Sequence, residues 1–122
     1  MNKYLNDNKL NIIYYEYSYL LTMSIDIILS KVPMPHGKNA TFIMRVDNPK
    51  EITWNKIFDF CEERSKLPRR FIKACNFDGK MVLGKLDEHI PFNYEKFRLR
   101  SQDGKYIKSA FVSMGLTPWG NN

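Results

Sequence analysis

The sequence is poor in the residues from which catalytic and metal sites are usually built. It has two histidines, His36 and His89, and its two cysteines form no CxxC pair. The six glycines follow no phosphate-loop spacing, and there is no HExxH motif. We therefore expect no enzymatic activity, no metal site and no cofactor.

Long uninterrupted apolar runs are missing as well. Residues 12–29 are the one candidate for a signal or an anchor, but Glu16 and Asp26 interrupt them and no small-residue cleavage site follows. A spanning helix needs roughly 20 apolar residues, and a secretory signal needs an uncharged apolar stretch. Two cysteines are also too few for a disulfide framework. The sequence therefore predicts a soluble, cytoplasmic protein without a membrane partner.

The chain does have an excess of positive charge and enough apolar residues for a core. Its 19 lysines and arginines against 13 aspartates and glutamates give a net charge of +6. This excess favours a polyanionic partner, either nucleic acid or an acidic protein surface. With 122 residues, 43% of them hydrophobic, we expect one domain over residues 1–122. Residues 1–11 are expected to be a flexible start and residues 115–122 a tail.

The stretch from Asn48 to Gly79 carries the clearest helix signals. The segment Asn48–Glu51 has the capping residue, the proline and the acidic residue of a helix start. One face of the following helix carries its apolar side chains, Trp54, Ile57, Phe58 and Cys61. Pro68 ends this helix and opens a second, short one through Cys75. Both cysteines are expected to be buried on the apolar sides of these helices.

Two segments that precede the helices alternate with the period of a strand. Residues 13–29 do so over a length that predicts a break near residues 22–24, although residues 12–21 also fit a helix. A second strand over residues 40–46 returns antiparallel through the loop at residues 33–39. The first strand carries a ladder of tyrosines, Tyr15, Tyr17 and Tyr19. A homodimer through this tyrosine-rich strand is predicted if the strand lies at a sheet edge.

Shorter elements follow the helices. Residues 81–83 form a brief apolar strand and residues 86–93 a loop. Residues 97–100 and 106–114 alternate and are expected to form a hairpin. Trp119 in the tail is expected to dock on the domain.

The turn of this hairpin is predicted from Asp103-Gly104, which favours a two-residue type I′ turn. In that register Arg100 opposes Ile107 and Arg98 opposes Ser109. The basic side chains of the first strand then lie on one side of the hairpin, because alternate residues of a strand share a face.

These elements predict an α+β fold, in which a small antiparallel sheet packs against a kinked helical pair. The sheet would combine the N-terminal strands with the C-terminal hairpin. A winged-helix arrangement is the alternative, with residues 68–75 as the reading helix and the hairpin as the wing. The shortness of that helix and the early strands count against it.

Two basic clusters are the candidate binding residues. The helical pair carries the first cluster, Arg64, Lys66, Arg69, Arg70 and Lys73. The hairpin carries the second, Lys96, Arg98, Arg100, Lys105 and Lys108, with the rings of Tyr106 and Phe111 beside it. Such groups contact phosphates and stack on bases, but they also occur at solvated helix ends and on charged edge strands. We expect the two clusters to share one exposed face.

The resulting hypothesis is a non-enzymatic nucleic-acid-binding domain, which contacts mainly the phosphates of RNA or of single strands. The alternative hypothesis is a small protein-interaction module or inhibitor of phage or mobile-element type. It would dock its basic face on an acidic or nucleic-acid-binding surface of a larger enzyme.

Overall fold

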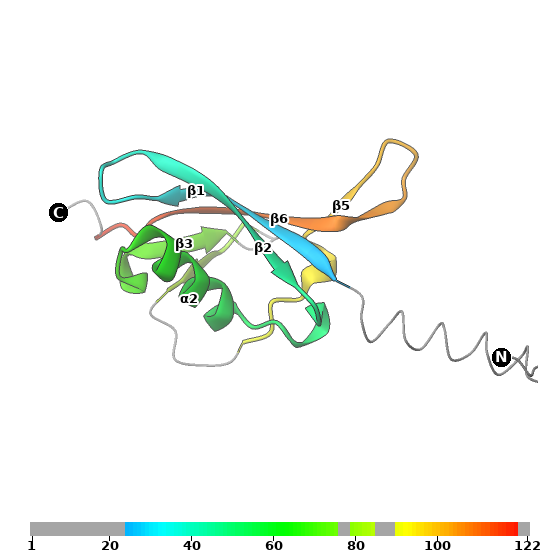
Figure 1. The fold of residues 1–122 in the computed structure, drawn as a ribbon, viewed down its shortest axis with the longest axis horizontal. Helices are drawn as coiled ribbons and strands as arrows, with labels where there is room; N and C mark the ends of the chain where they lie inside the picture. Colours follow the sequence, from blue (N-terminus) through cyan, green and yellow to red (C-terminus); the bar gives the residue numbers. More distant parts are fainter. Residues whose placement is uncertain (1–23, 76–78, 85–89, 120–122) are drawn as a thin grey trace, which may run out of the picture.

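The computed structural model describes residues 24–75, 79–84 and 90–119 (Figure 1). The strands are β1 (Ile25–Pro33), β2 (Asn39–Val46), β3 (Ile72–Cys75), β4 (Met81–Leu83), β5 (Arg98–Arg100) and β6 (Tyr106–Leu116). The described residues also form one α-helix, α2 (Trp54–Ser65), and three 3-10 turns, η1 (Pro49–Glu51), η2 (Arg69–Phe71) and η3 (Tyr94–Lys96). The protein is therefore an α+β structure built on one six-stranded sheet.

The central strand of the sheet is β6. Along one side it pairs in parallel with β1, and along the other it pairs antiparallel with β5 at its start and β3 at its end. β2 then pairs with β1, and β4 with β3. The parallel β1–β6 pair makes the sheet mixed, so the prediction of an antiparallel sheet is wrong for this pair. A parallel pair needs a long crossover connection, and the whole chain between β1 and β6 provides it.

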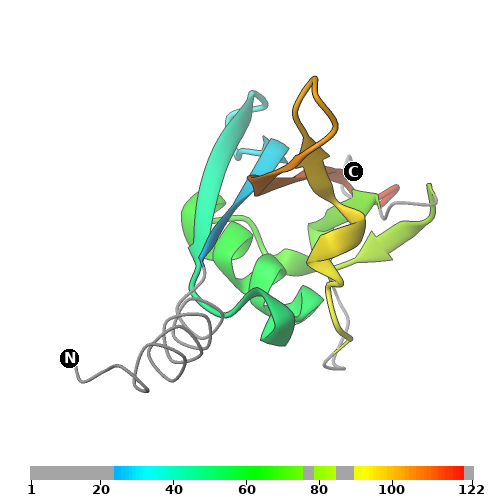
Figure 2. The same ribbon diagram turned by 90° about the vertical axis from the view of Figure 1, so that its right-hand side faces the viewer.

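Helix α2 packs against one face of the sheet (Figures 1 and 2). The strands face it with a buried row from β1 and a buried row from β6, namely Ile25, Ile27, Leu29, Ala110, Val112 and Met114. The helix contributes Trp54, Ile57, Phe58 and Cys61, as the sequence predicts. The other face of the sheet is not covered by any described helix. The period-two pattern predicted from the sequence is thus confirmed for the described part of the first strand.

An aromatic cluster fixes the chain that leads into the hairpin. Trp54 packs edge-on against Phe92 and Phe97, with ring centres 5.0 and 5.7 Å apart. The backbone N–H of Trp54 donates to the carbonyl of Ile90, and that of Phe92 donates to the carbonyl of Ile52. The start of α2 therefore holds the segment that precedes β5.

The helix begins later than the sequence predicts. The hydroxyl of Thr53 accepts from the backbone N–H of Lys56 and caps α2, whereas Asn48 makes no side-chain capping bond. The predicted start at residues 49–51 is the separate turn η1. At the other end, Lys66 adopts a left-handed conformation with φ 65°, and its N–H donates to the carbonyl of Glu62.

The predicted second helix is wrong. Residues 68–75 instead form the turn η2 and the strand β3, so the kinked helical pair does not exist and the winged-helix alternative loses its reading helix. Ile72 and Ala74 both point inward against the core, while Cys75 is exposed rather than buried. In so short a segment the apolar residues fit a helix and a strand equally well, and pairing with β6 decides between them.

The β5–β6 hairpin turns through a three-residue loop rather than the predicted two-residue loop. The N–H of Gly104 donates to the carbonyl of Ser101, and the N–H of Ser101 donates to the carbonyl of Lys105. Gly104 takes a positive φ of 85°. Such a loop is a type I turn followed by a left-handed residue, a position that glycine occupies without strain.

The longer loop changes the register of the hairpin. Arg100 opposes Tyr106 and Arg98 opposes Ala110, each one position away from the predicted partner. The ladder is irregular between these two pairs, since β6 has more residues there than β5. Both arginines therefore meet a different part of β6 from the one expected.

Several predictions fall on residues that the structure does not describe. The tyrosine-rich segment, its break and its homodimer contact lie there, as do residues 1–11 and His89. Among the described residues, β2, β4 and the loop between β1 and β2 are confirmed at the predicted places. No helix in the described ranges is long and apolar enough to cross a bilayer.

The two cysteines should differ sharply in reactivity. Cys61 is fully buried, and burial raises the pKa of its thiol to about 12, whereas Cys75 is exposed. We expect iodoacetamide at about pH 8 to modify Cys75 and to spare Cys61 in the folded protein. Mass spectrometry should find one adduct before denaturation and two after it. Equal rates of modification at both thiols would contradict this burial.

Candidate functional site

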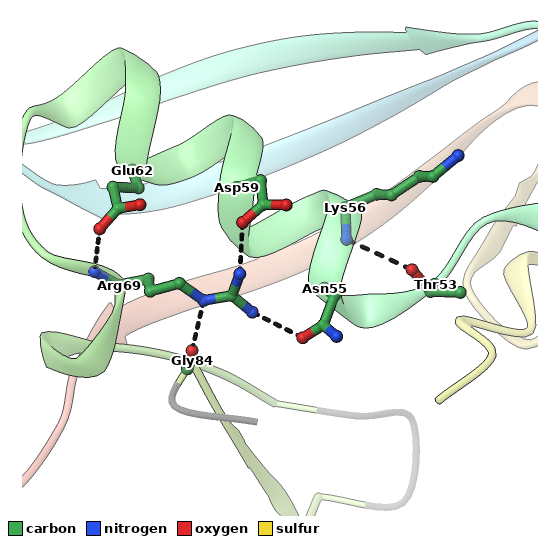
Figure 3. Close-up of polar contacts among 7 residues, drawn as sticks. All are labelled: Thr53, Asn55, Lys56, Asp59, Glu62, Arg69 and Gly84. Carbon is green, nitrogen blue, oxygen red and sulfur yellow. Dashed lines mark hydrogen bonds and ion pairs between the residues drawn. The ribbon is translucent and has the colours of Figure 1, made fainter. Parts of the chain in front are cut away.

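Arg69, the centre of the first predicted cluster, is held by the protein itself (Figure 3). Its Nε donates to the carbonyl of Gly84 at 2.6 Å, and its Nη2 donates to Oδ1 of Asn55 at 2.6 Å. Its Nη1 forms an ion pair with Asp59, and its backbone N–H donates to Oε2 of Glu62 at 2.8 Å. Three positions of α2 and the chain after β4 therefore converge on one arginine.

These contacts give Arg69 a structural role that the sequence analysis did not predict. Its side chain is 23% exposed, and its guanidinium is directed at protein acceptors rather than at solvent. Gly84 belongs to the same contact, since a Cβ at that position would lie 1.9 Å from the carbonyl oxygen of Arg69. Only glycine lets the two backbones approach so closely. Asp59 and Glu62, three residues apart on the helix, were the signal in the sequence for this role.

The remaining arginines of the first cluster lie against neighbouring rings. The guanidinium of Arg64 lies 4.5 Å from the centre of the Phe60 ring. That of Arg70 lies 4.5 Å from the centre of the Phe71 ring. The carbonyl oxygen of Arg70 also accepts from Nε1 of Trp119 at 3.1 Å, which confirms that Trp119 docks on the domain.

The two lysines of this cluster diverge. Lys66 is the exposed residue that ends α2. Lys73 lies on β3 between the buried Ile72 and Ala74, so it points to the sheet face opposite α2. Its Cε lies 3.3 Å from the place a Cβ of Gly115 would take, so its stem runs across the central strand. The first cluster is therefore not one surface.

The hairpin arginines, in contrast, are gathered around one ring. The guanidinium carbon of Arg98 lies 4.7 Å from the centre of the Tyr106 ring, and that of Arg100 lies 4.2 Å from it. Nη2 of Arg100 donates to the Tyr106 hydroxyl at 2.8 Å, and Nη1 donates to the carbonyl of Gly104 at 3.1 Å. Arg98 also lies 5.8 Å from the ring of Tyr94. Tyr94 is a member of this group that the sequence analysis missed.

No carboxylate among the described residues forms an ion pair with Arg98 or Arg100. The Nε of Arg98 is buried and has no hydrogen-bond acceptor within the described part of the chain. Asp103, the nearest acid in the loop, is engaged in the turn. Hydrogen bonds from the Ser101 hydroxyl and then from the Lys105 backbone N–H lower its pKa. Within the described ranges, the positive charge of these two guanidinium groups is therefore not neutralised by an ion pair.

The other predicted residues of the second cluster do not all lie beside Arg98 and Arg100. Lys96 lies in η3, and Lys105 and Lys108 are exposed at the start of the hairpin's second strand. Phe111, which is 44% exposed, opposes Ile28 of β1 on the face of the sheet opposite α2. It therefore packs across β1 and β6 and does not join the tyrosine–arginine group, contrary to the predicted pair of stacking rings.

The two basic clusters do not share a face. β5 pairs with the start of β6 and β3 pairs with its end. A strand of 11 residues spans roughly 35 Å, so the hairpin arginines and the turn η2 lie at opposite ends of the sheet. Figure 1 shows this arrangement, with the orange hairpin tip at one end of the long axis and the C-terminal end of α2 towards the other. The prediction of a single basic plane is wrong.

The described residues offer no second kind of site. No three histidine, cysteine, aspartate or glutamate side chains in the described ranges lie close enough to hold a metal ion. Two shallow hollows flank η1, one beside β2 and one beside η3, and neither contains a histidine or cysteine. The group of Arg98, Arg100, Tyr94 and Tyr106, termed the hairpin cluster below, is therefore the candidate site.

Comparisons with known proteins add no assignment. The chain matches no protein-family model, and neither the curated proteins nor the solved structures gave a significant match.

The two adjacent arginines of η2 provide a test of the structural role of Arg69. Arg69→Ala removes the bonds of the guanidinium to Asn55 and Asp59 and leaves the carbonyl of Gly84 without this donor, so we expect the free energy of unfolding to fall by about 2–4 kcal/mol. Arg70→Ala, the matched control, removes an exposed side chain and should change it by less than about 0.5 kcal/mol. Urea denaturation followed by circular dichroism measures both. Equal effects would contradict the assignment.

The loop of the hairpin should respond to acid through Asp103. The pKa of Asp103 is lowered in the folded protein, so its ionised carboxylate stabilises the folded state. This stabilisation is fully present above the unfolded pKa and is lost as the pH falls through the folded pKa. Ser101→Ala removes the largest cause, and the pKa of Asp103 should rise toward its ordinary value. A carboxyl titration followed by NMR measures this shift. Ser30→Ala, remote from the loop, should leave the Asp103 titration unchanged.

Proposed function

We propose that the protein binds nucleic acid through the hairpin cluster and does so without catalysis. The observation that supports this is the placement of two guanidinium groups over the single ring of Tyr106, with no ion-paired carboxylate among the described residues. Two like charges held together repel each other, and a polyanion removes that repulsion. The hairpin is thus preorganised for an anionic ligand.

Arginine is suited to phosphate because its planar fork can donate two parallel hydrogen bonds. The ring of Tyr106 and the carbonyl of Gly104 fix the orientation of Arg100 before any ligand arrives. The guanidinium of Arg98 lies near the rings of both Tyr94 and Tyr106. Less side-chain entropy is then lost on binding than with free arginines.

The expected role of Tyr106 changes in this proposal. Its ring supports arginines, so it orients the charged groups rather than receiving a base directly. Unstacked bases can stack on guanidinium planes as well as on aromatic rings. Together these features favour RNA or another single strand, whose bases are accessible, over a duplex.

The charge around the hairpin cluster supports the same ligand. Residues 95–108 contain five lysines and arginines against two acids, and one of these acids, Asp103, is bound in the turn. The positive surface that would face the phosphate backbone of a nucleic acid is extended by Lys96, Lys105 and Lys108. Lysine contributes there as a point charge rather than as a fork.

Fluorescence anisotropy with a labelled single-stranded RNA tests the proposal. We expect affinity to fall steeply between about 50 and 200 mM salt, because each neutralised phosphate releases counterions. The double variant Arg98→Ala/Arg100→Ala should bind roughly tenfold or more weakly, and its salt slope should fall by about 1.4. Single-stranded DNA and duplex DNA serve as further probes in the same assay.

A matched control removes the same charge elsewhere. Lys38→Ala/Arg70→Ala lowers the net charge equally, but both residues are exposed and lie at the end of the sheet opposite the hairpin, Lys38 between β1 and β2 and Arg70 in η2. Its affinity should stay within about twofold of wild type if the contacts are local. Binding that is independent of salt, or equal losses in both double variants, would reject the proposal. Recovery of one stoichiometric acidic protein that survives nuclease treatment would instead assign the hairpin to a protein partner.

A further inference from the structure

Strand β2 lies at the edge of the sheet. In the sheet order it has β1 as its neighbour on one side, and no described strand pairs with it on the other. It is eight residues long, so its outer edge is a long row of backbone donors and acceptors. An edge of this kind is a template for pairing with another strand.

The usual protection of such an edge is weak in β2. Its sequence contains no proline and no lysine, and Arg45 is its one charged residue. Asp26 binds Arg45 through two hydrogen bonds, Nε to Oδ1 at 2.8 Å and Nη2 to Oδ2 at 3.2 Å. The charge that would repel a second strand is therefore neutralised within the same protein molecule.

An apolar row runs across the uncovered face of the sheet and stops at this edge. Ile28 opposes Ile43 on one side and Phe111 on the other, so the three side chains are neighbours across β2, β1 and β6. Ile43 is 61% exposed, more than any other large apolar side chain described. The most exposed member of the row is thus the one at the free edge.

A second β2 fits this edge in one antiparallel register about a two-fold axis. With Ile43 opposite its own copy, Thr41 opposes Arg45, and the remaining pairs are Ala40 with Val46 and Phe42 with Met44. No like charges meet, and apolar side chains oppose apolar ones on the core side. Moving the axis by one residue places Ile43 opposite Thr41 or opposite Arg45. The register centred on Ile43 also joins the two apolar rows into one.

We propose that the partner of β2 is a second copy of this chain, paired antiparallel through β2 with Ile43 at the two-fold axis. The contact uses a strand different from the tyrosine-rich segment that the sequence suggested. It also leaves the hairpin cluster free, because β5 pairs with the side of β6 that faces away from β1 and β2. The β2 edge and the hairpin cluster are therefore separate surfaces of the protein.

Sedimentation equilibrium of the full chain over a range of concentrations tests the dimer. We expect wild type to approach twice the 14.5 kDa mass of one chain. Ile43→Lys places two ammonium groups opposite each other and should raise the dimer dissociation constant by about tenfold or more. Ile107→Lys, which changes another exposed isoleucine, on the hairpin, should leave the dissociation constant unchanged.

A cross-link measures the register independently. In a Cys75→Ser background, Ile43→Cys should form a disulfide-linked dimer on mild oxidation, because opposed residues of antiparallel strands lie within disulfide reach. Ile107→Cys in the same background is the control and should not. A wild type that stays monomeric at every concentration would overturn the proposal. An Ile43→Lys variant that still dimerises fully, or equal cross-linking at both positions, would overturn it as well.

Discussion

The contact of Arg69 with α2 and the chain after β4 is the constraint on which the arrangement of the protein depends. Apolar packing holds α2 against β1 and β6, but packing alone is not directional. Arg69 adds four directed bonds, three of them to groups on the helix, and Gly84 lets the backbones meet. This contact sets where the helix ends relative to β3 and β4, and hence where the sheet edge on that side lies.

The fold could be predicted from the sequence where the hydrophobic period was long. β2 and the inward face of α2 follow their patterns closely, because eight or more residues distinguish a period of 2 from one of 3.6. β3 has four residues, too few for that distinction. The sequence therefore predicts a helix after Pro68, whereas residues 72–75 form a strand that pairs with β6. The parallel β1–β6 pair is a long-range choice that no local pattern encodes.

The candidate site was predictable in its residue types but not in its contacts. The sequence shows the arginines, yet it does not show which of them meet carboxylates and which meet rings. Arg69 contacts Asp59 and Glu62 through the turn at η2, whereas Arg98 and Arg100 contact Tyr106 through a register that is set by one extra loop residue and by the irregularity in the β5–β6 ladder. Equivalent side chains therefore acquire different contacts: Arg69 bonds to acceptors on α2, and Arg98 and Arg100 pack on the ring of Tyr106.

The position of β6 at the centre of the sheet has a consequence for how the protein is made. β6 is the last of the described strands in chain order, yet β1, β3 and β5 all pair with it. During synthesis from the N-terminus, the ribosome must release residues 106–116 before these three strands can be joined. Until then the side of β1 that pairs with β6 is open, and an unpaired strand edge of this kind is the part of a nascent chain most prone to pairing with another chain.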